Sequence, residues 1–327
     1  MNGGCRATQI GSWPGTDMGA AQRIAFAETP DLPCLVELPA RAIGAGMIGR
    51  TAAILVDLPI DLQPAGWRIA SGAARDQRVA RSLLRADLDQ LEEAAQGYAG
   101  PVKLAFAGPW TRAATVEQTR GDKVLADHGA RRHLAGSLAE GITQLRDELA
   151  RRLPDMSVRW QLDEPMLAMV AGGAVATASG FSRFRSVDTP ELVATLDTVI
   201  TAVDDCWLHS CASDLPIDAM LRTAATGLSV DASLISSPGW DLFGPALEAG
   251  TEVALGVVAT DGPVPTADQV AAAVLRRWES LGLDASALVR LWLTPTCGLA
   301  GRAEPDAVDT LRVLHRAAEQ VNDRVLG

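Results

Sequence analysis

The sequence contains little lysine and has an excess of acidic side chains. Only two of its 327 residues are lysines, Lys103 and Lys123, and 29 Lys and Arg stand against 40 Asp and Glu, giving a formal net charge of −11. Non-specific binding to phosphate backbones depends on clustered cationic side chains that displace counterions. The composition therefore disfavours nucleic acid as a partner.

Long apolar runs and a paired set of cysteines are also missing. No hydrophobic stretch approaches the roughly 20 residues that cross a bilayer, and the N-terminus has neither the basic nor the apolar region of a signal peptide. The five cysteines are an odd number and lie far apart, so a disulfide framework is not expected. These absences predict a cytoplasmic protein that binds no membrane. Hydrophobic residues make up 48% of the chain, which is enough for a large core.

Short apolar segments alternate with helix-like segments along the whole chain. Eight segments have the composition of buried strands and end in polar, Gly or Pro clusters: 7–14, 34–39, 102–111, 158–165, 206–213, 227–233, 252–263 and 289–299. Helices are expected at 17–28, 75–98, 121–152, 190–203, 214–225, 265–281 and 304–323. This order predicts an α/β fold, a single (β/α)8 TIM barrel that spans residues 1–327 as one domain. A doubly wound open sheet is the alternative that the same alternation allows.

Residues 44–49 match the glycine pattern G-x-G-x-x-G of dinucleotide-binding sites. That pattern needs a strand directly before it and an acidic residue about 20 residues further on. Here Pro39 follows the preceding strand, and Asp57 comes only eight residues after Gly49, which leaves too little chain for a crossover helix. We therefore expect residues 40–70 to form an irregular loop with room for a short helix, and no Rossmann site.

His209, Cys211 and Cys297 are candidate metal ligands. His209 and Cys211 are two residues apart in a predicted strand, so their side chains point to the same face. Cys297 lies just past the apolar core of the last predicted strand, in the cluster that ends segment 289–299, where a turn would expose its thiol at the mouth of the barrel. Two sulfurs and one nitrogen suit zinc. The alternative is a strand-end histidine beside a buried cysteine, without a metal.

A fourth ligand is expected from another strand end, and Asp231 is placed for it. The alternative role for Asp231 is a helix N-cap. A site with two thiolates and a carboxylate is rich in electrons, so it is better suited to binding a substrate sulfur than to activating water. An incoming thiol would be held as a thiolate at neutral pH.

Two further strand ends carry groups that suit an amino acid. Asp163 ends the fourth predicted strand and could accept a substrate ammonium. The alternative is a helix start, with Asp163 at the N-cap and Pro165 in the first turn. Gly11 and Ser12 follow the first strand and could donate hydrogen bonds to a carboxylate, or form an ordinary turn. An amino-acid thiol would satisfy both groups.

The sequence resembles the C-terminal catalytic barrel of cobalamin-independent methionine synthase. Five segments carry the resemblance in order along nearly the whole chain: IGSWP at 10–14, GPWT at 108–111, DEP at 163–165, HSC at 209–211 and CGL at 297–299. The resemblance implies zinc-dependent transfer of a methyl group to homocysteine, giving methionine. It further implies that His209, Cys211 and Cys297 bind zinc, that Ser12 and Asp163 bind the amino-acid part of homocysteine, and that Glu37 adds a second carboxylate for the ammonium.

Four departures from the family pattern concern the metal and the methyl donor. Asp231 stands nearest to a family glutamate ligand, and Thr296 precedes Cys297 where the family has aspartate. Asp261 replaces a family histidine that helps to protonate the leaving group. The additional N-terminal barrel of the long members, which helps to hold folate, has no room in 327 residues. The expected donor is therefore either methyltetrahydrofolate, with Asp261 as the substitute acid, or a methyl-corrinoid, free or carried by a corrinoid protein.

Other functions remain as alternatives. Related zinc barrels alkylate other thiols such as coenzyme M, and the Asp163 and Ser12 pair favours an amino-acid thiol over these. A non-catalytic descendant that binds zinc and a partner would not require the substrate-binding groups. A zinc hydrolase is disfavoured by two cysteine ligands.

Overall fold

The computed structural model describes residues 3–72 and 74–327. The strands are β1 (Arg6–Ala7), β2 (Ile60–Gln63), β3 (Gly66–Ile69), β4 (Pro101–Ala107), β5 (Ser157–Asp163), β6 (Cys206–Ser210), β7 (Gly227–Asp231), β8 (Glu252–Val258) and β9 (Leu291–Pro295). The α-helices are α1 (Met18–Glu28), α2 (Met47–Ala52), α3 (Arg75–Ala94), α4 (Pro109–Thr115), α5 (His128–Arg152), α6 (Leu167–Ala171), α7 (Thr189–Ile200), α8 (Ile217–Leu221), α9 (Ser237–Ala249), α10 (Ala267–Leu281) and α11 (Glu304–Leu326). Among the described residues, no helix has the length and apolar character that crossing a membrane requires.

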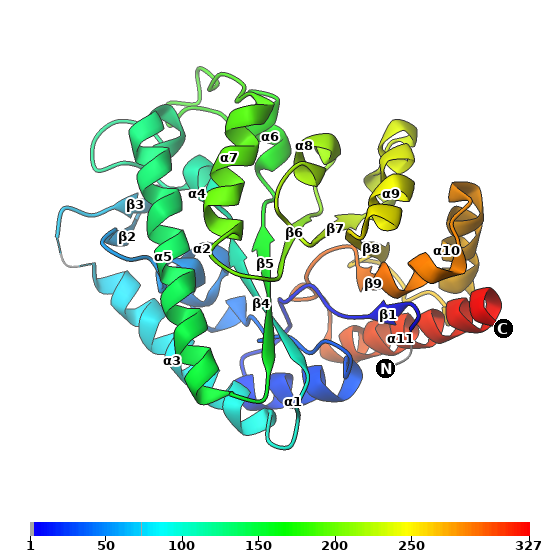
Figure 1. Cartoon of the computed structure of the whole chain (residues 1–327). Helices are drawn as coiled ribbons and strands as arrows, with labels where there is room; N and C mark the ends of the chain where they lie inside the picture. Colours follow the sequence, from blue (N-terminus) through cyan, green and yellow to red (C-terminus); the bar gives the residue numbers. More distant parts are fainter. Residues whose placement is uncertain (1–2, 73) are drawn as a thin grey trace.

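Seven parallel strands form one curled sheet in the order β1-β9-β8-β7-β6-β5-β4, with helices around its outside (Figure 1). The segment 33–37 joins the two ends of this sheet. On one side, the Leu35 amide donates to the Lys103 carbonyl of β4 at 2.8 Å. On the other, the Trp13 amide, in the segment that follows β1, donates to the Glu37 carbonyl at 2.8 Å. The predicted TIM barrel is confirmed, and the open sheet is not formed.

The segment predicted as a strand at 34–39 takes the eighth position of the barrel without forming a regular strand. It makes two isolated parallel bridges, Cys34 with Lys103 and Ser12 with Glu37. Pro39 begins a short 3-10 helix at the end of this segment, because proline fixes φ and has no amide to continue a ladder. The first predicted strand, 7–14, is likewise regular only over Arg6–Ala7.

Residues 40–70 contain more regular structure than the irregular loop that the sequence predicts. They form two 3-10 turns, the short helix α2 and an antiparallel hairpin of β2 and β3. Gly49 lies in close packing: a Cβ there would lie 2.5 Å from the Ile43 carbonyl oxygen and 2.9 Å from the Trp67 side chain. Gly49 therefore serves close packing, and the residues directly before the pattern form 3-10 turns rather than a strand.

Several helices differ from their predicted bounds. Helix α9 was not predicted, because Gly239, Gly244 and Pro245 resemble helix breakers. It forms because Ser236 caps its first turn by accepting from the Gly239 amide, and because it buries Trp240 against the barrel. The helix expected at 121–152 begins only at His128, where the Asp127 side chain provides the N-cap. The helix expected at 214–225 is limited to Ile217–Leu221.

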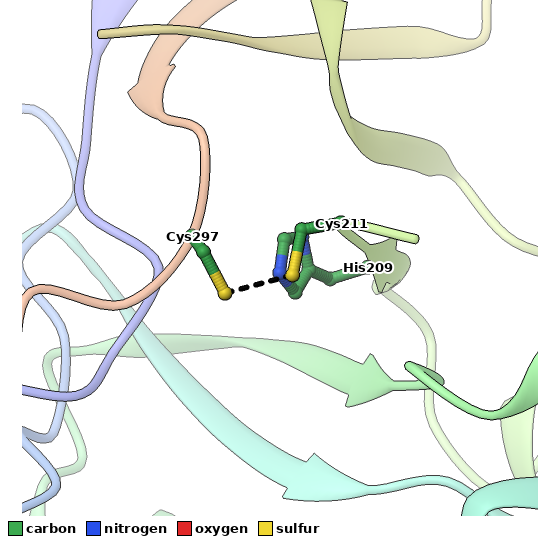
Figure 2. A group of neighbouring side chains, drawn as sticks. All are labelled: His209, Cys211 and Cys297. Carbon is green, nitrogen blue, oxygen red and sulfur yellow. Dashed lines mark hydrogen bonds between the residues drawn. The ribbon is translucent and has the colours of Figure 1, made fainter. Parts of the chain in front are cut away.

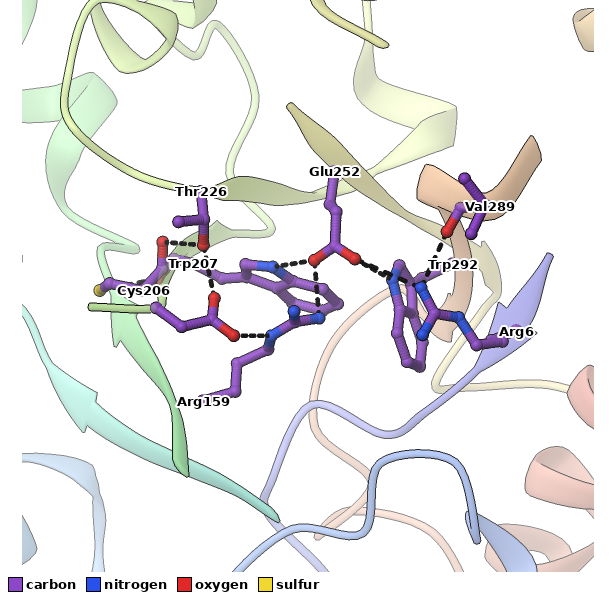
Figure 3. Close-up of polar contacts among 9 residues, drawn as sticks. Arg6, Arg159, Cys206, Trp207, Thr226, Glu252, Val289 and Trp292 are labelled. Carbon is purple, nitrogen blue, oxygen red and sulfur yellow. Dashed lines mark hydrogen bonds and ion pairs between the residues drawn. The ribbon is translucent and has the colours of Figure 1, made fainter. Parts of the chain in front are cut away.

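Charged and aromatic side chains fill the barrel at the amino ends of its strands (Figure 3). Glu252 of β8 accepts hydrogen bonds from the indole N–H groups of Trp207 at 3.0 Å and Trp292 at 3.2 Å. It also pairs with Arg159 at 2.7 Å and with Arg6 at 3.3 Å. Glu252 is partly buried, and a carboxylate with reduced access to water is tolerated when its oxygens are paired in this way. This network leaves the opposite end of the barrel as the place for a binding site.

Two glycines of α5 give a direct test of the packing. A Cβ at Gly141 would lie 1.8 Å from the Ile54 carbonyl oxygen, whereas a Cβ at Gly136 would meet no atom within 4 Å. We predict that Gly141→Ala lowers the free energy of unfolding by about 1–3 kcal/mol, as overpacking does. Gly136→Ala should raise it by about 0.5–1 kcal/mol, because alanine favours helix. Urea unfolding of both variants measures this, and equal effects would contradict the packing described here.

Candidate metal centre

Three predicted ligands meet at the carboxyl ends of the strands. His209 lies in β6, Cys211 follows it, and Cys297 lies just past β9 on the other side of the mouth (Figure 2). Their ligand atoms all lie within 4.8 Å of one another, and the two sulfurs are 2.7 Å apart. The strand period places His209 and Cys211 on the inner face of β6, and the curvature of the sheet brings Cys297 opposite them.

A neighbouring strand fixes the ring of His209. Its Nδ1 atom lies 3.1 Å from the Ser229 carbonyl oxygen and 3.0 Å from the Ser229 hydroxyl. A carbonyl oxygen can only accept, so Nδ1 carries the proton and donates it to β7. The other nitrogen, Nε2, then keeps its lone pair for a metal. This is the arrangement by which proteins usually orient histidine ligands.

The contact between the sulfurs of Cys211 and Cys297 shifts the pKa of both thiols. A hydrogen bond joins the two sulfurs, and either of them can be its donor. This contact lowers the pKa of Cys297, and His209 acts in the same direction. The same contact raises the pKa of Cys211, and its partial burial adds to this effect. One thiolate therefore forms readily, and a bound cation would favour the second.

The three side chains line one wall of a cavity of about 300 Å³. The other predicted substrate-binding residues, Ser12, Glu37 and Asp163, line the same cavity. Gly298 permits this closeness, because a Cβ at that position would lie 1.9 Å from the Ser12 hydroxyl oxygen. The cavity thus combines a sulfur and nitrogen wall with hydroxyl and carboxylate groups.

Both carboxylates of the cavity are buried, and neither has a direct ion-pair partner among the described residues. Burial raises the pKa of Glu37 to about 7, although the charge of Arg50 acts to lower it. Burial also raises the pKa of Asp163, against the opposing effects of His209 and of a hydrogen bond from Gln161. A cation entering the cavity would be attracted by these groups.

Asp231 and Asp261 do not join this group in the structure. The Asp231 carboxylate accepts from the Ser233 amide at 2.8 Å and the Ser233 hydroxyl at 2.7 Å, which is the capping role that the sequence left open. Asp261 is exposed on the loop after β8, and Arg302 holds this loop by donating to the Ala259 carbonyl at 2.6 Å. The cavity lining described above includes neither aspartate.

Sequence reasoning missed the part played by Glu164, which is completely buried. Its carboxylate accepts from the Trp110 amide at 2.9 Å and from the Thr111 amide and hydroxyl at 2.6 Å each. Gly108 leaves room for it, since a Cβ there would lie 2.3 Å from Glu164 Oε1. The carboxylate therefore ties the end of β5, where Asp163 lies, to the start of α4. The sequence feature that could have indicated this contact is the presence of both DEP at 163–165 and GPWT at 108–111.

The donor set fits a metal ion of the zinc type. Two cysteine sulfurs and one imidazole nitrogen are ligands that zinc prefers. The hydrogen bond from His209 to Ser229 of β7 orients the ring as such ligands require. Three protein ligands with a further position for substrate are typical of catalytic rather than structural zinc. The site can hold such an ion beside a small molecule.

The fold and the cluster define a (β/α)8 barrel with a candidate metal centre at the carboxyl ends of its strands. The family model described as the catalytic domain of cobalamin-independent synthase matches residues 5–320. The chain therefore belongs to the cobalamin-independent methionine synthase family and carries its catalytic domain, that of a methionine synthase-type methyltransferase. No curated protein sequence matches it.

The solved structures similar to this chain include a methionine synthase and a mannanase. A B12-independent methionine synthase from Shewanella sp. W3-18-1, in complex with selenomethionine, is 15% identical, with a TM-score of 0.67 and coverage of 99% of each chain. At this identity the likeness concerns the fold. A Cellulomonas fimi endo-beta-1,4-mannanase double mutant is 14% identical, with a TM-score of 0.42 over 96% of this chain and 77% of the other, and it is too distant to bear on function.

We predict that Cys297→Ser lowers the zinc bound per chain well below one equivalent, because a serine hydroxyl does not replace a thiolate ligand. The matched control is Cys206→Ser, which alters a buried thiol at the opposite end of β6. That variant should keep its zinc and lose only stability. Elemental mass spectrometry of the purified proteins measures both, and full zinc content in Cys297→Ser would remove Cys297 from the site.

Proposed function

We propose that this protein transfers a methyl group to the thiol of homocysteine and forms methionine, with zinc held by His209, Cys211 and Cys297. The observation that carries the proposal is that these three side chains share one cavity with Asp163, Glu37 and Ser12. A site for a metal alone would not need buried carboxylates facing the ligands. The selenomethionine complex of the Shewanella structure supports an amino-acid ligand of this size.

The chain's own residues would bind the amino-acid part of the substrate. Asp163 and Glu37 would accept the ammonium, which supplies the positive charge that these buried carboxylates lack. The Ser12 hydroxyl would donate to the substrate carboxylate. When bound, zinc would lower the pKa of the substrate thiol and so hold it as a nucleophilic thiolate.

The reaction is a displacement at the methyl carbon. A bond forms between the homocysteine sulfur and that carbon, the bond from carbon to the donor breaks, and its electron pair remains on the donor. The thiol proton is released to solvent water. With methyltetrahydrofolate the electron pair stays on nitrogen, which must take up a proton, and Asp261 is the proposed acid. With a methyl-corrinoid, free or on a protein, the pair stays on cobalt and no proton is needed.

Asp231 is the proposed fourth zinc ligand in the absence of substrate. It ends β7, the strand next to β6 in the sheet. To act as a ligand, its carboxylate would exchange the hydrogen bonds from Ser233 for the metal. Asp231 would thus contact either Ser233 or the metal, and the contact with Ser233 is the one in the structure.

Zinc-loaded protein and homocysteine should give methionine, detected by mass spectrometry, from methyltetrahydrofolate, from methylcobalamin or from both. Cys297→Ser should give none. Formation of a methylated product only from 2-mercaptoethanesulfonate would transfer the proposal to a coenzyme M-like acceptor. No methylated thiol from any pair of donor and acceptor, with zinc bound, would favour the non-catalytic alternative.

Asp261→Asn separates the two donors. If Asp261 supplies the proton, the rate with methyltetrahydrofolate should fall by about a hundredfold, as loss of a general acid does. The rate with methylcobalamin should stay unchanged in the same preparation, which controls for folding and zinc content. Equal rates of the variant and the wild type with folate would remove Asp261 from the mechanism.

A further inference from the structure

Lys103, one of the two lysines, is connected to the cavity residue Asp163 through Gln161. It belongs to β4, and its side chain is completely buried. Its ammonium donates to the Gln9 carbonyl and to Gln161 Oε1, the latter at 2.6 Å, and no ion pair involves it in the described part of the chain. A buried ammonium costs several kcal/mol by rough estimates of desolvation. A lysine in this position therefore calls for a reason other than stability.

The contact with Lys103 fixes which way the Gln161 amide faces. An ammonium has donors and no acceptor, so the oxygen of the amide must point to Lys103 and the NH2 group must point away from it. That NH2 group donates to Asp163 Oδ1 at 2.7 Å and to the Ile10 carbonyl at 3.1 Å. A flipped amide would place its oxygen against two acceptors and its NH2 group against a donor.

One amide thus connects the two walls that face the substrate. Asp163 is the carboxylate proposed for the substrate ammonium, and Ile10 belongs to the segment that continues through Gly11 to Ser12, the group proposed for the carboxylate. All of these residues except Gln161 line the cavity. Gln161 is completely buried behind them, so it does not contact the substrate.

We propose that Gln161 and Lys103 are positioning residues that give the site its selectivity for an amino-acid thiol. Gln161 sets the distance between Asp163 and the Ile10–Ser12 segment. It also donates a hydrogen bond to Oδ1 of Asp163, which leaves the other carboxylate oxygen to face the substrate ammonium. Lys103 acts through Gln161 by holding the orientation of its amide. This inference rests on the proposed function, because it concerns recognition of the same substrate.

A direct electrostatic role of Lys103 would have the opposite sign. The positive charge of Lys103 repels a substrate ammonium. It also favours the ionised form of Asp163, but without a direct ion pair. If repulsion dominated, Lys103→Met would strengthen the binding of an amino acid. If Lys103 acts by holding Gln161, the same variant weakens that binding, because the amide becomes free to turn its oxygen toward Asp163.

The test measures binding rather than turnover. Zinc-loaded wild type, Gln161→Leu, Lys103→Met and the double variant are titrated calorimetrically at pH 7 with methionine and with the analogue of methionine that lacks the α-amino group. Gln77→Leu is the matched control, since Gln77 is also buried and donates to two carbonyls, those of Ala52 and Leu58, away from the cavity. Zinc content and thermal unfolding are recorded for every variant.

In Gln161→Leu, we expect the dissociation constant for methionine to rise about tenfold or more, as loss of a hydrogen bond to a charged group does. The constant for the analogue should change much less, so the preference for methionine should collapse, while zinc content stays at the wild-type value. Gln77→Leu should be destabilised without any change in this preference. Lys103→Met should weaken methionine binding in the wild-type background and have no further effect beside Gln161→Leu.

Each contrary result has a distinct meaning. Unchanged methionine binding in Gln161→Leu, with zinc present and the wild type binding normally, would overturn the inference and leave the proposed function intact. Tighter methionine binding in Lys103→Met would replace the positioning role of Lys103 by simple repulsion. Failure of the zinc-loaded wild type to bind methionine would contradict both the proposed function and this inference. If Gln161→Leu fails to fold, Gln161→Glu provides the same test, since a carboxylate cannot donate to Asp163.

Discussion

Closure of the parallel ladder by residues 33–37 is the constraint on which the candidate site depends. The Leu35 amide bonds to β4, and Glu37 is bonded to the segment after β1, so the two ends of a seven-stranded sheet are held as a ring. Once the ring is closed, the carboxyl ends of β6 and β9 face each other across its mouth. Cys297 then reaches His209 and Cys211, although 86 residues separate the two cysteines. An open sheet would place these strand ends along one edge.

The two ends of the barrel differ in how the charge of their carboxylates is compensated. At the amino ends, Glu252 is satisfied by two arginines and two indoles, so its charge is balanced within the protein. At the carboxyl ends, Glu37 and Asp163 are buried with incomplete compensation, and burial raises the pKa of each. The first arrangement fills a core. The second leaves two buried carboxylates whose negative charge a cationic ligand can compensate. This feature indicates that the carboxyl end of the barrel is the functional end.

Support for the site comes from residues that do not face the substrate. Ser229 orients His209 from β7, Glu164 ties the strand end that bears Asp163 to α4, and Gln161 links Asp163 to Ile10. Each contact is made by a buried polar group whose hydrogen bonds would be costly to lose. A site of this kind is held by its surroundings before any ligand arrives, and such preorganisation is what binding and catalysis require.

The fold class and the residue types of the site follow from the amino-acid sequence alone. Alternation of apolar and helical segments is a local property, so the barrel and the strand-end positions of His209, Cys211 and Cys297 could be predicted from it. Local patterns failed where long-range contacts decide: α9 forms despite its glycines and Pro245 because it buries Trp240, and residues 60–69 pair as a hairpin.

Which strand-end groups share one cavity depends on the folded chain and is not visible in the sequence pattern. Asp231, Asp261 and Asp163 all lie at or just after the ends of strands. Asp231 accepts a hydrogen bond from the Ser233 amide and Asp261 is exposed, whereas Asp163 shares the cavity with the candidate ligands. The same limit applied to Lys103 and Gln161, whose spacing in the sequence contains no sign of their contact. The physical reason is that ring closure and side-chain burial set these distances, and both are properties of the whole chain.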